Sequence, residues 1–149
     1  MLNFTDEQIV FQEVPGEVSL AYTIAGCPLG CKGCHSSYSW HTAQGTVLSH
    51  NYLQQRLNTY QGLISCVLFL GGEWQPQALL PLLILARSAG LNTCLYTGLD
   101  DVSPELKQQL IYLKTGRWLA ELGGLSSPGT NQRFIDLRTG HCLNHLFIR

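Results

Sequence analysis

The chain has 149 residues, of which 45% are hydrophobic and 13% are charged, and its formal net charge is −1. This composition is ample for a packed core and argues against disorder, and the length favours one compact domain over residues 1–149. The near-neutral charge leaves no basic field for a nucleic-acid backbone, so nucleic acid is not expected as a partner.

The amino terminus and the cysteine count bear on location. The first residues lack the basic and apolar regions of a signal peptide. The longest apolar stretch, Ala78 to Ala86, is too short to span a bilayer, so no membrane is expected. Six cysteines are more credible as metal ligands or free thiols of a reducing compartment than as a disulfide framework. We therefore expect a cytoplasmic protein.

The predicted elements alternate between strands and helices along the chain. Four apolar runs indicate strands, at residues 18–24, 64–70, 92–96 and 110–113. Helical patterns with caps or breakers at their ends separate them, at residues 49–61, 76–88 and from Ser103 onward. Strands separated by helices imply crossovers, so the expected fold class is α/β with a mainly parallel sheet. Residues 133–137 and 142–148, joined by a turn, suggest a C-terminal hairpin.

Three cysteines lie within eight residues after the first predicted strand: Cys27, Cys31 and Cys34, at spacings of four and three. Structural zinc needs four closed ligands, and His35 is too close to Cys34 to complete a tetrahedron easily. Three cysteines on a cubane cluster leave one iron open to a small molecule. The spacing therefore favours a [4Fe–4S] cluster over zinc, while a chance group of core or disulfide cysteines stays open.

The CxxxCxxC spacing resembles the signature of the radical S-adenosylmethionine (SAM) enzymes. The resemblance implies that Cys27, Cys31 and Cys34 ligate a [4Fe–4S] cluster, and that SAM chelates the fourth iron and is cleaved to methionine and a 5′-deoxyadenosyl radical. It also implies a partial (β/α) radical-SAM barrel, since a full (β/α)₈ barrel needs about 250 residues. The backbone at Cys34 is the implied adenine contact, with its neighbours Gly33 and His35. Gly33 departs from the aromatic residue that many members carry before the last cysteine, and His35 could serve in its place or be an exposed loop imidazole.

The motif Gly71-Gly72-Glu73 follows the second predicted strand, at the edge of a parallel α/β sheet where ligands bind. Glycines let a ligand approach the backbone closely, although an isolated Gly-Gly pair is also a common turn. In radical SAM enzymes a GGE or GGD motif contacts the methionine end of SAM, which implies that Glu73 accepts a hydrogen bond from the SAM amino group. Thr97 and Lys114, near the ends of later strands, are further candidates for contact with the SAM carboxylate or ribose.

Later segments resemble the anaerobic ribonucleoside-triphosphate reductase activating proteins. The matching segments are Pro15-Gly16, Tyr96-Thr97-Gly98, Leu113 to Trp118 and Gly129 to Arg133. The resemblance runs from about residue 11 to the C-terminus. It implies an activase that abstracts hydrogen from a glycine of the large reductase subunit and receives its electron from a flavodoxin-like protein. The small size agrees with a protein substrate, because little chain is left to enclose a bulky small molecule.

Two other interpretations stay open. The chain could activate another glycyl-radical enzyme, of the formate-lyase type, or it could be a noncatalytic iron–sulfur or zinc module in which Glu73 has no ligand. The dispersed cysteines, Cys66, Cys94 and Cys142, are expected to be structural, with Cys142 a faint metal candidate beside two histidines. The residue types of Asn131, Gln132 and Arg133 indicate no particular role.

Overall fold

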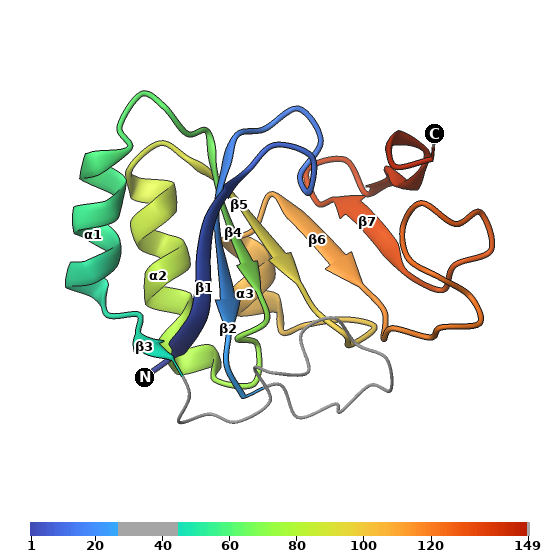
Figure 1. Cartoon of the computed structure of the whole chain (residues 1–149), viewed down its shortest axis with the longest axis horizontal. Coiled ribbons are helices and arrows are strands. Elements are labelled where there is room, and N and C mark those ends of the chain that lie inside the picture. Colours follow the sequence, from blue (N-terminus) through green and yellow to red (C-terminus); the bar gives the residue numbers. More distant parts are fainter. Residues whose placement is uncertain (27–44, 149) are drawn as a thin grey trace.

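The computed structural model describes residues 1–26 and 45–148. Within these residues the strands form one eight-stranded sheet in the order β3-β1-β2-β4-β5-β6-β7-β8 (Figure 1). The strands are β1 (Asn3–Val10), β2 (Ser19–Ile24), β3 (Thr46–Val47), β4 (Cys66–Leu70), β5 (Asn92–Tyr96), β6 (Tyr112–Thr115), β7 (Arg133–Asp136) and β8 (His141–Cys142). The helices are α1 (His50–Thr59), α2 (Pro76–Ser88), α3 (Pro104–Gln108) and the short 3₁₀ helix η2 (Asn144–Leu146).

The sheet is mixed, with its parallel part at the centre. Neighbouring strands β2, β4, β5 and β6 pair in parallel, whereas β1 pairs antiparallel with β2 and β7 pairs antiparallel with β6. The mainly parallel sheet expected from the sequence is therefore confined to the strands joined through α1, α2 and α3. The flanking strands are antiparallel because the chain turns back there without a crossover helix. The outermost strands, β3 and β8, do not pair with each other within the described residues, so the sheet is open.

The helices α1, α2 and α3 cover one face of the sheet (Figure 1). Alternate strand residues on this face pack with leucines of the helices to form the larger apolar core, for example Tyr22, Phe69 and Leu95 with Leu53 and Leu83. The opposite face carries a smaller apolar cluster, composed of Val14, Ala21, Cys66, Leu68, Cys94, Tyr112 and Phe134. Loop and tail residues pack on that cluster instead of helices, so the two faces differ in what covers them.

Strand β1 is absent from the sequence-based prediction, and its polar centre explains why. Asp6, Glu7 and Gln8 interrupt the apolar pattern that usually indicates a strand. Glu7 is tolerated because its carboxylate lies 3.3 Å from Nη2 of Arg56 and accepts a 3.0 Å hydrogen bond from the Tyr52 hydroxyl, both on α1. A partly buried ion pair across the sheet and helix thus replaces the apolar contact expected at this position.

The C-terminal hairpin has a shorter second strand than expected. Strand β8 ends at Cys142, where the sequence suggested a strand to residue 148. The side chain of Asn144 accepts from the backbone N–H of Phe134 at 2.8 Å and donates to the carbonyl of Gln132 at 2.8 Å. This amide satisfies the backbone groups that a longer strand would have paired, and η2 follows. Strand β6 also begins two residues later than predicted, at Tyr112.

Within the described residues, no helix has the length and apolar character needed to cross a membrane.

Candidate functional site

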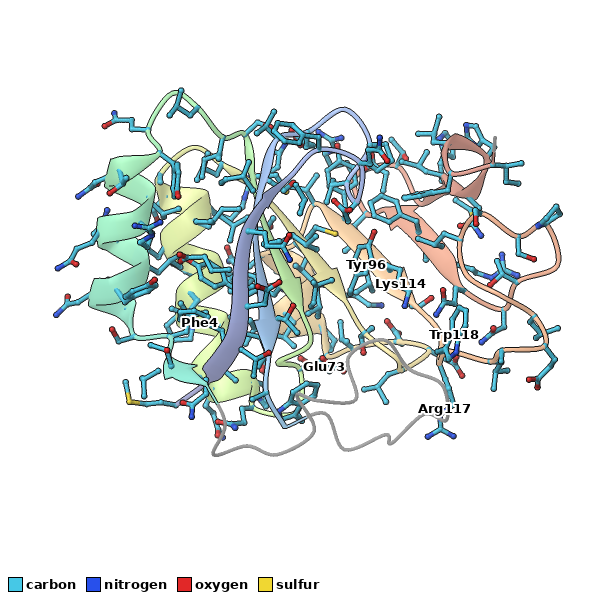
Figure 2. All side chains as sticks on the ribbon, in the orientation of Figure 1. Phe4, Glu73, Tyr96, Lys114, Arg117 and Trp118 are labelled. Atoms are coloured by element: carbon cyan, nitrogen blue, oxygen red, sulfur yellow. The ribbon has the colours of Figure 1, made fainter. Side chains whose placement is uncertain are left out.

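Four parallel strands end at one edge of the sheet and bring distant residues together there. Strand β2 ends at Ile24, three residues before Cys27. Strand β4 leads directly into Gly71-Gly72-Glu73, and β5 leads into Thr97. Lys114 is the penultimate residue of β6, close to the same edge. Figure 2 shows Glu73 at this edge, with Lys114 beside Tyr96 on the neighbouring strands. Ligands of parallel α/β sheets bind at such an edge.

The sequence-predicted residues of β4, β5 and β6 are therefore brought together. The cluster-loop residues predicted from the sequence lie outside the described residues: Cys27, Cys31, Gly33, Cys34 and His35.

The glycine pair makes the turn by which the chain leaves β4. Gly71 and Gly72 have φ values of +97° and +109°, which L side chains rarely adopt. A Cβ on Gly71 would lie 2.5 Å from the indole of Trp74. A Cβ on Gly72 would make ordinary contacts, the nearest at 3.4 Å from Leu2. Close packing of Trp74 thus accounts for Gly71, and backbone conformation alone accounts for Gly72.

Glu73 has one paired and one unpaired carboxylate oxygen. The Thr97 hydroxyl donates to Oε1 of Glu73 at 2.7 Å, and the same hydroxyl accepts from the backbone N–H of Leu99 at 3.0 Å. Oε2 is buried and has no hydrogen-bond partner among the described residues. A buried acceptor without a partner costs about 1–3 kcal/mol, so this oxygen is suited to a donor brought by a ligand.

Opposing effects act on the ionisation of Glu73. Burial is the largest and raises the pKa of the carboxyl above its usual value. The hydrogen bond from Thr97, a backbone hydrogen bond and the positive charge of Lys114 each lower that pKa in part. Without Thr97 and Lys114, burial would favour the neutral acid more strongly, and a neutral acid attracts a cationic ligand less.

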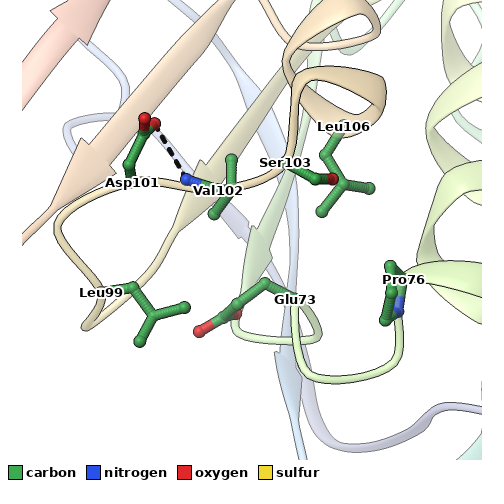
Figure 3. Close-up of a pocket in the computed structure, with 7 residues that line it drawn as sticks. All are labelled: Glu73, Pro76, Leu99, Asp101, Val102, Ser103 and Leu106. Carbon is green, nitrogen blue, oxygen red and sulfur yellow. Dashed lines mark hydrogen bonds between the residues drawn. The ribbon is translucent and has the colours of Figure 1, made fainter.

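A pocket of about 360 Å³ opens beside Glu73. Figure 3 shows it between the turn after β4 and the segment before α3, lined by Glu73, Pro76, Leu99, Asp101, Val102, Ser103 and Leu106. The Asp101 carboxylate is paired with Lys107 at 2.7 Å, on the exposed rim. Glu73 therefore supplies the carboxylate that is not already committed, within walls that are mostly apolar, as in many small-molecule sites.

Lys114 supplies a positive charge near the same edge. Its Nζ lies 5.4 Å from the centre of the Tyr96 ring, in a cation–π contact. Tyr96 is fixed in turn, because its hydroxyl donates to the backbone carbonyl of Glu13. A negative group of a ligand at this edge would find Lys114 held against a rigid ring.

Asn131 and Gln132 brace the turn that follows β6. Nε2 of Gln132 donates to the carbonyl of Gly116 at 3.2 Å, and Nδ2 of Asn131 donates to the carbonyl of Arg117 at 3.0 Å. Gln132 is buried, whereas Arg133 is exposed at the start of β7. The two amides thus have an architectural role that the sequence pattern does not indicate.

Sequence reasoning missed the pocket residues after β5, namely Leu99, Asp101 and Ser103. Their signal was present, because a Ser-Pro helix start only seven residues after a strand end implies a tight connection at the ligand-binding edge. The three dispersed cysteines lie away from this edge. Cys66 and Cys94 are buried in the smaller apolar cluster and burial raises the pKa of Cys66 to about 12, whereas Cys142 is exposed.

The sequence also suggested Cys142, beside two histidines, as a metal candidate, and the described structure does not support this interpretation. In residues 1–26 and 45–148, no three His, Cys, Asp or Glu side chains are grouped so as to hold a metal ion.

The fold is thus an open α/β sheet, and the carboxylate of Glu73, with one oxygen hydrogen-bonded and the other unpaired, lies at the carboxyl edge of its parallel strands. Residues 14–115, more than half of the chain, match the model of the 4Fe-4S single cluster domain family. The chain belongs to this family and carries a [4Fe–4S] cluster domain. The matched range includes the three-cysteine motif, Glu73, Thr97 and Lys114. A search among curated proteins gives no significant match.

Proposed function

We propose that the chain is a radical SAM activase that generates a glycyl radical on the large subunit of anaerobic ribonucleoside-triphosphate reductase. The observation that carries this proposal is the buried, unpaired Oε2 of Glu73, held at the carboxyl edge of β4 in a chain of the 4Fe-4S single cluster family. A protein that only stored a cluster would have no need for a buried carboxylate with an open acceptor, which costs stability. A ligand with an amino group would satisfy it.

The residues of the edge fit the two charges of the methionine end of SAM. Oε2 of Glu73 would accept from the amino group, and Lys114 would attract the carboxylate. Cys27, Cys31 and Cys34 would ligate the cluster, with the backbone from Gly33 to His35 against the adenine. When bound, the cluster and SAM supply the one-electron cleavage that yields the radical used on the reductase glycine. The protein's own residues, Glu73 and Lys114, would bind and orient SAM.

An open sheet supports a protein substrate. All three α-helices cover one face, and the sheet does not close within the described residues. We propose that the fold is a partial (β/α) radical-SAM barrel and that the glycine loop of the reductase enters at the open side. A flavodoxin-like protein would donate the electron, and the cytoplasm would be the site of the reaction.

Anaerobic reconstitution with iron and sulfide tests the chemistry directly. EPR spectra of the reduced protein should show a cubane signal that shifts on addition of SAM, and product analysis should find 5′-deoxyadenosine. Cys31→Ala should abolish both results, because the cluster would lose a ligand. Cys142→Ser is the matched control, since Cys142 is exposed and lies on β8, an outermost strand of the sheet, and it should retain both. Full 5′-deoxyadenosine production by Cys31→Ala would contradict the ligand assignment.

Exchange of the protein substrate tests the target. The reconstituted protein is incubated anaerobically with SAM, reductant and either the large reductase subunit or a formate-lyase subunit, and the glycyl radical is detected by EPR. A radical on the reductase subunit alone is expected. A radical on the lyase alone would move the proposal to that class of partner, and a protein that binds zinc and no SAM would replace it with a noncatalytic module.

A further inference from the structure

The hydrogen bonds around Glu73 assign a role to the strand that follows it. Thr97 lies directly after β5, is 2% exposed, and places its hydroxyl 2.7 Å from Oε1 of Glu73. We propose that Thr97 is a positioning residue for SAM binding: its hydroxyl holds Oε1 of Glu73, so that Oε2 alone is presented to the amino group of SAM. The inference rests on the proposed function for its ligand, whereas the hydrogen bond itself stands independently.

The direction of the Thr97 hydrogen is set by its second contact. The backbone N–H of Leu99 donates to Oγ1 of Thr97 at 3.0 Å. A hydroxyl has one hydrogen to donate, and with a lone pair already engaged by Leu99 the hydrogen is directed toward Oε1 of Glu73. The backbone of Thr97 is also fixed, since its N–H donates to the carbonyl of Lys114 at 2.8 Å. The donor is therefore held in place before any ligand arrives.

A fixed donor does two things for Glu73. It restricts the carboxylate to one orientation, which reduces the conformational entropy that ligand binding would otherwise cost. It also stabilises the ionised form against the effect of burial, and only an ionised carboxylate attracts a cationic amino group. The other groups that face this region in the described chain are Lys114 on β6, which also favours the ionised form, and Asp101 before α3, which is paired with Lys107.

Two threonines of this region provide a matched experiment. Thr97→Val keeps the shape of the side chain and removes the donor, whereas Thr97→Ser keeps the hydroxyl. Thr93→Val is the control, because Thr93 is also buried, lies on β5 and directs its hydroxyl to the carbonyl of Gln109, away from Glu73. Thermal unfolding of each variant first confirms that it is folded, and Thr97→Ala replaces Thr97→Val if the latter is not.

The first measurement is SAM affinity of the reconstituted protein by equilibrium dialysis across a pH series. Thr97→Val should weaken binding about tenfold near neutral pH, the equivalent of one hydrogen bond to a charged group. Over the pH range in which the visible absorbance shows that the cluster is retained, its binding should also fall at a higher pH on acidification than that of the wild type. Thr97→Ser should restore most of the affinity, and Thr93→Val should bind as the wild type does.

The second measurement does not depend on SAM. Infrared pH titration of the reconstituted protein, with Glu73→Gln subtracted to isolate the Glu73 carboxylate band, should show a higher midpoint in Thr97→Val and no change in Thr93→Val. Unchanged affinity and an unchanged midpoint in Thr97→Val would overturn the inference, as would a Thr97→Ser variant as weak as Thr97→Val. A shifted midpoint with no SAM binding by the wild type would instead overturn the ligand and the proposed function, and would leave the hydrogen bond between Thr97 and Glu73 intact.

Discussion

One carboxylate oxygen of Glu73 lacks a hydrogen-bond partner in the ligand-free fold that the structure describes. Its Oε1 is satisfied by Thr97, but its Oε2 is buried without a partner among the described residues. A side chain selected for stability alone would have both oxygens paired or would be neutral. The unpaired oxygen is thus an energetic deficit that a bound donor would remove, which is a common feature of sites whose activity conflicts with stability.

Replacing Glu73 by Gln should remove a pH-dependent loss of stability. Folding raises the pKa of Glu73 through burial, so the folded state favours the protonated acid. The stability that this group contributes is present below its unfolded pKa and is lost as pH rises through the folded pKa. As pH rises above about 4, near the usual pKa of a Glu carboxyl, ligand-free Glu73→Gln should therefore gain free energy of unfolding relative to the wild type, as urea unfolding measures.

The control for this prediction is Glu121→Gln, at an exposed position in the loop after β6. The difference between Glu121→Gln and the wild type should stay small over the same range. A Glu73→Gln difference that is independent of pH would show that the carboxylate is not penalised by burial.

At the scale of elements, the turn after β6 depends on a side chain that lies directly before the next strand, β7. Gln132 is 4% exposed and donates to the buried carbonyl of Gly116. Gln132→Ala should lower the free energy of unfolding by about 1–3 kcal/mol, because that carbonyl loses a partner and cannot reach water. Gln77→Ala, at an exposed position on α2, should change it by less than about 0.5 kcal/mol. Chemical denaturation of the two variants measures both values, and equal effects would contradict the bracing role.

The elements differ in how well the sequence predicts them. The bounds of β4, β5 and α2 are predicted within one or two residues. Each of these elements has an apolar run bounded by Gly, Ser or Pro, so the signal lies in its own residues. Strand β1 could not be found from its own residues, since its polar centre is compensated by Arg56 and Tyr52 on α1. The early end of β8 likewise depends on Asn144 pairing with β7, a tertiary contact that no periodicity encodes.

In the candidate site, too, some features are encoded locally in the sequence and others depend on tertiary contacts. Glu73 is a candidate from the sequence because a Gly-Gly-Glu motif at a strand end carries a local signal together with a family resemblance. The role of Thr97 as a partner of Glu73 could not be derived, because it depends on the parallel pairing of β4 with β5 in one register. A strand-end threonine has no distinctive sequence signal, so its hydrogen bond is visible only in three dimensions.

At the scale of the whole molecule, Leu2 and Asn3, at the start of β1, bind both ends of the segment that contains the cysteines. The N–H of Ala25, before this segment, donates to the carbonyl of Asn3 at 2.8 Å, and the N–H of Leu48, after it, donates to the carbonyl of Leu2 at 2.8 Å. The residues on either side of this segment, Ala25 and Leu48, are thus both held by the backbone at the start of β1. The apolar clusters on the two faces of the sheet pack side chains from β1 to β7 against one another.

Removal of the cluster should therefore leave the sheet folded. At pH 7 the deprotonation of three thiols of pKa ~8.5 costs on the order of 2 kcal/mol each, and each lower pH unit adds about 1.4 kcal/mol per thiol. Mild acid or an iron chelator should accordingly bleach the visible absorbance of the cluster. Far-UV circular dichroism should change little, because the backbone hydrogen bonds of Ala25 and Leu48 and both apolar clusters remain. A parallel loss of both signals would instead mean that cluster binding and folding of the sheet are one coupled step.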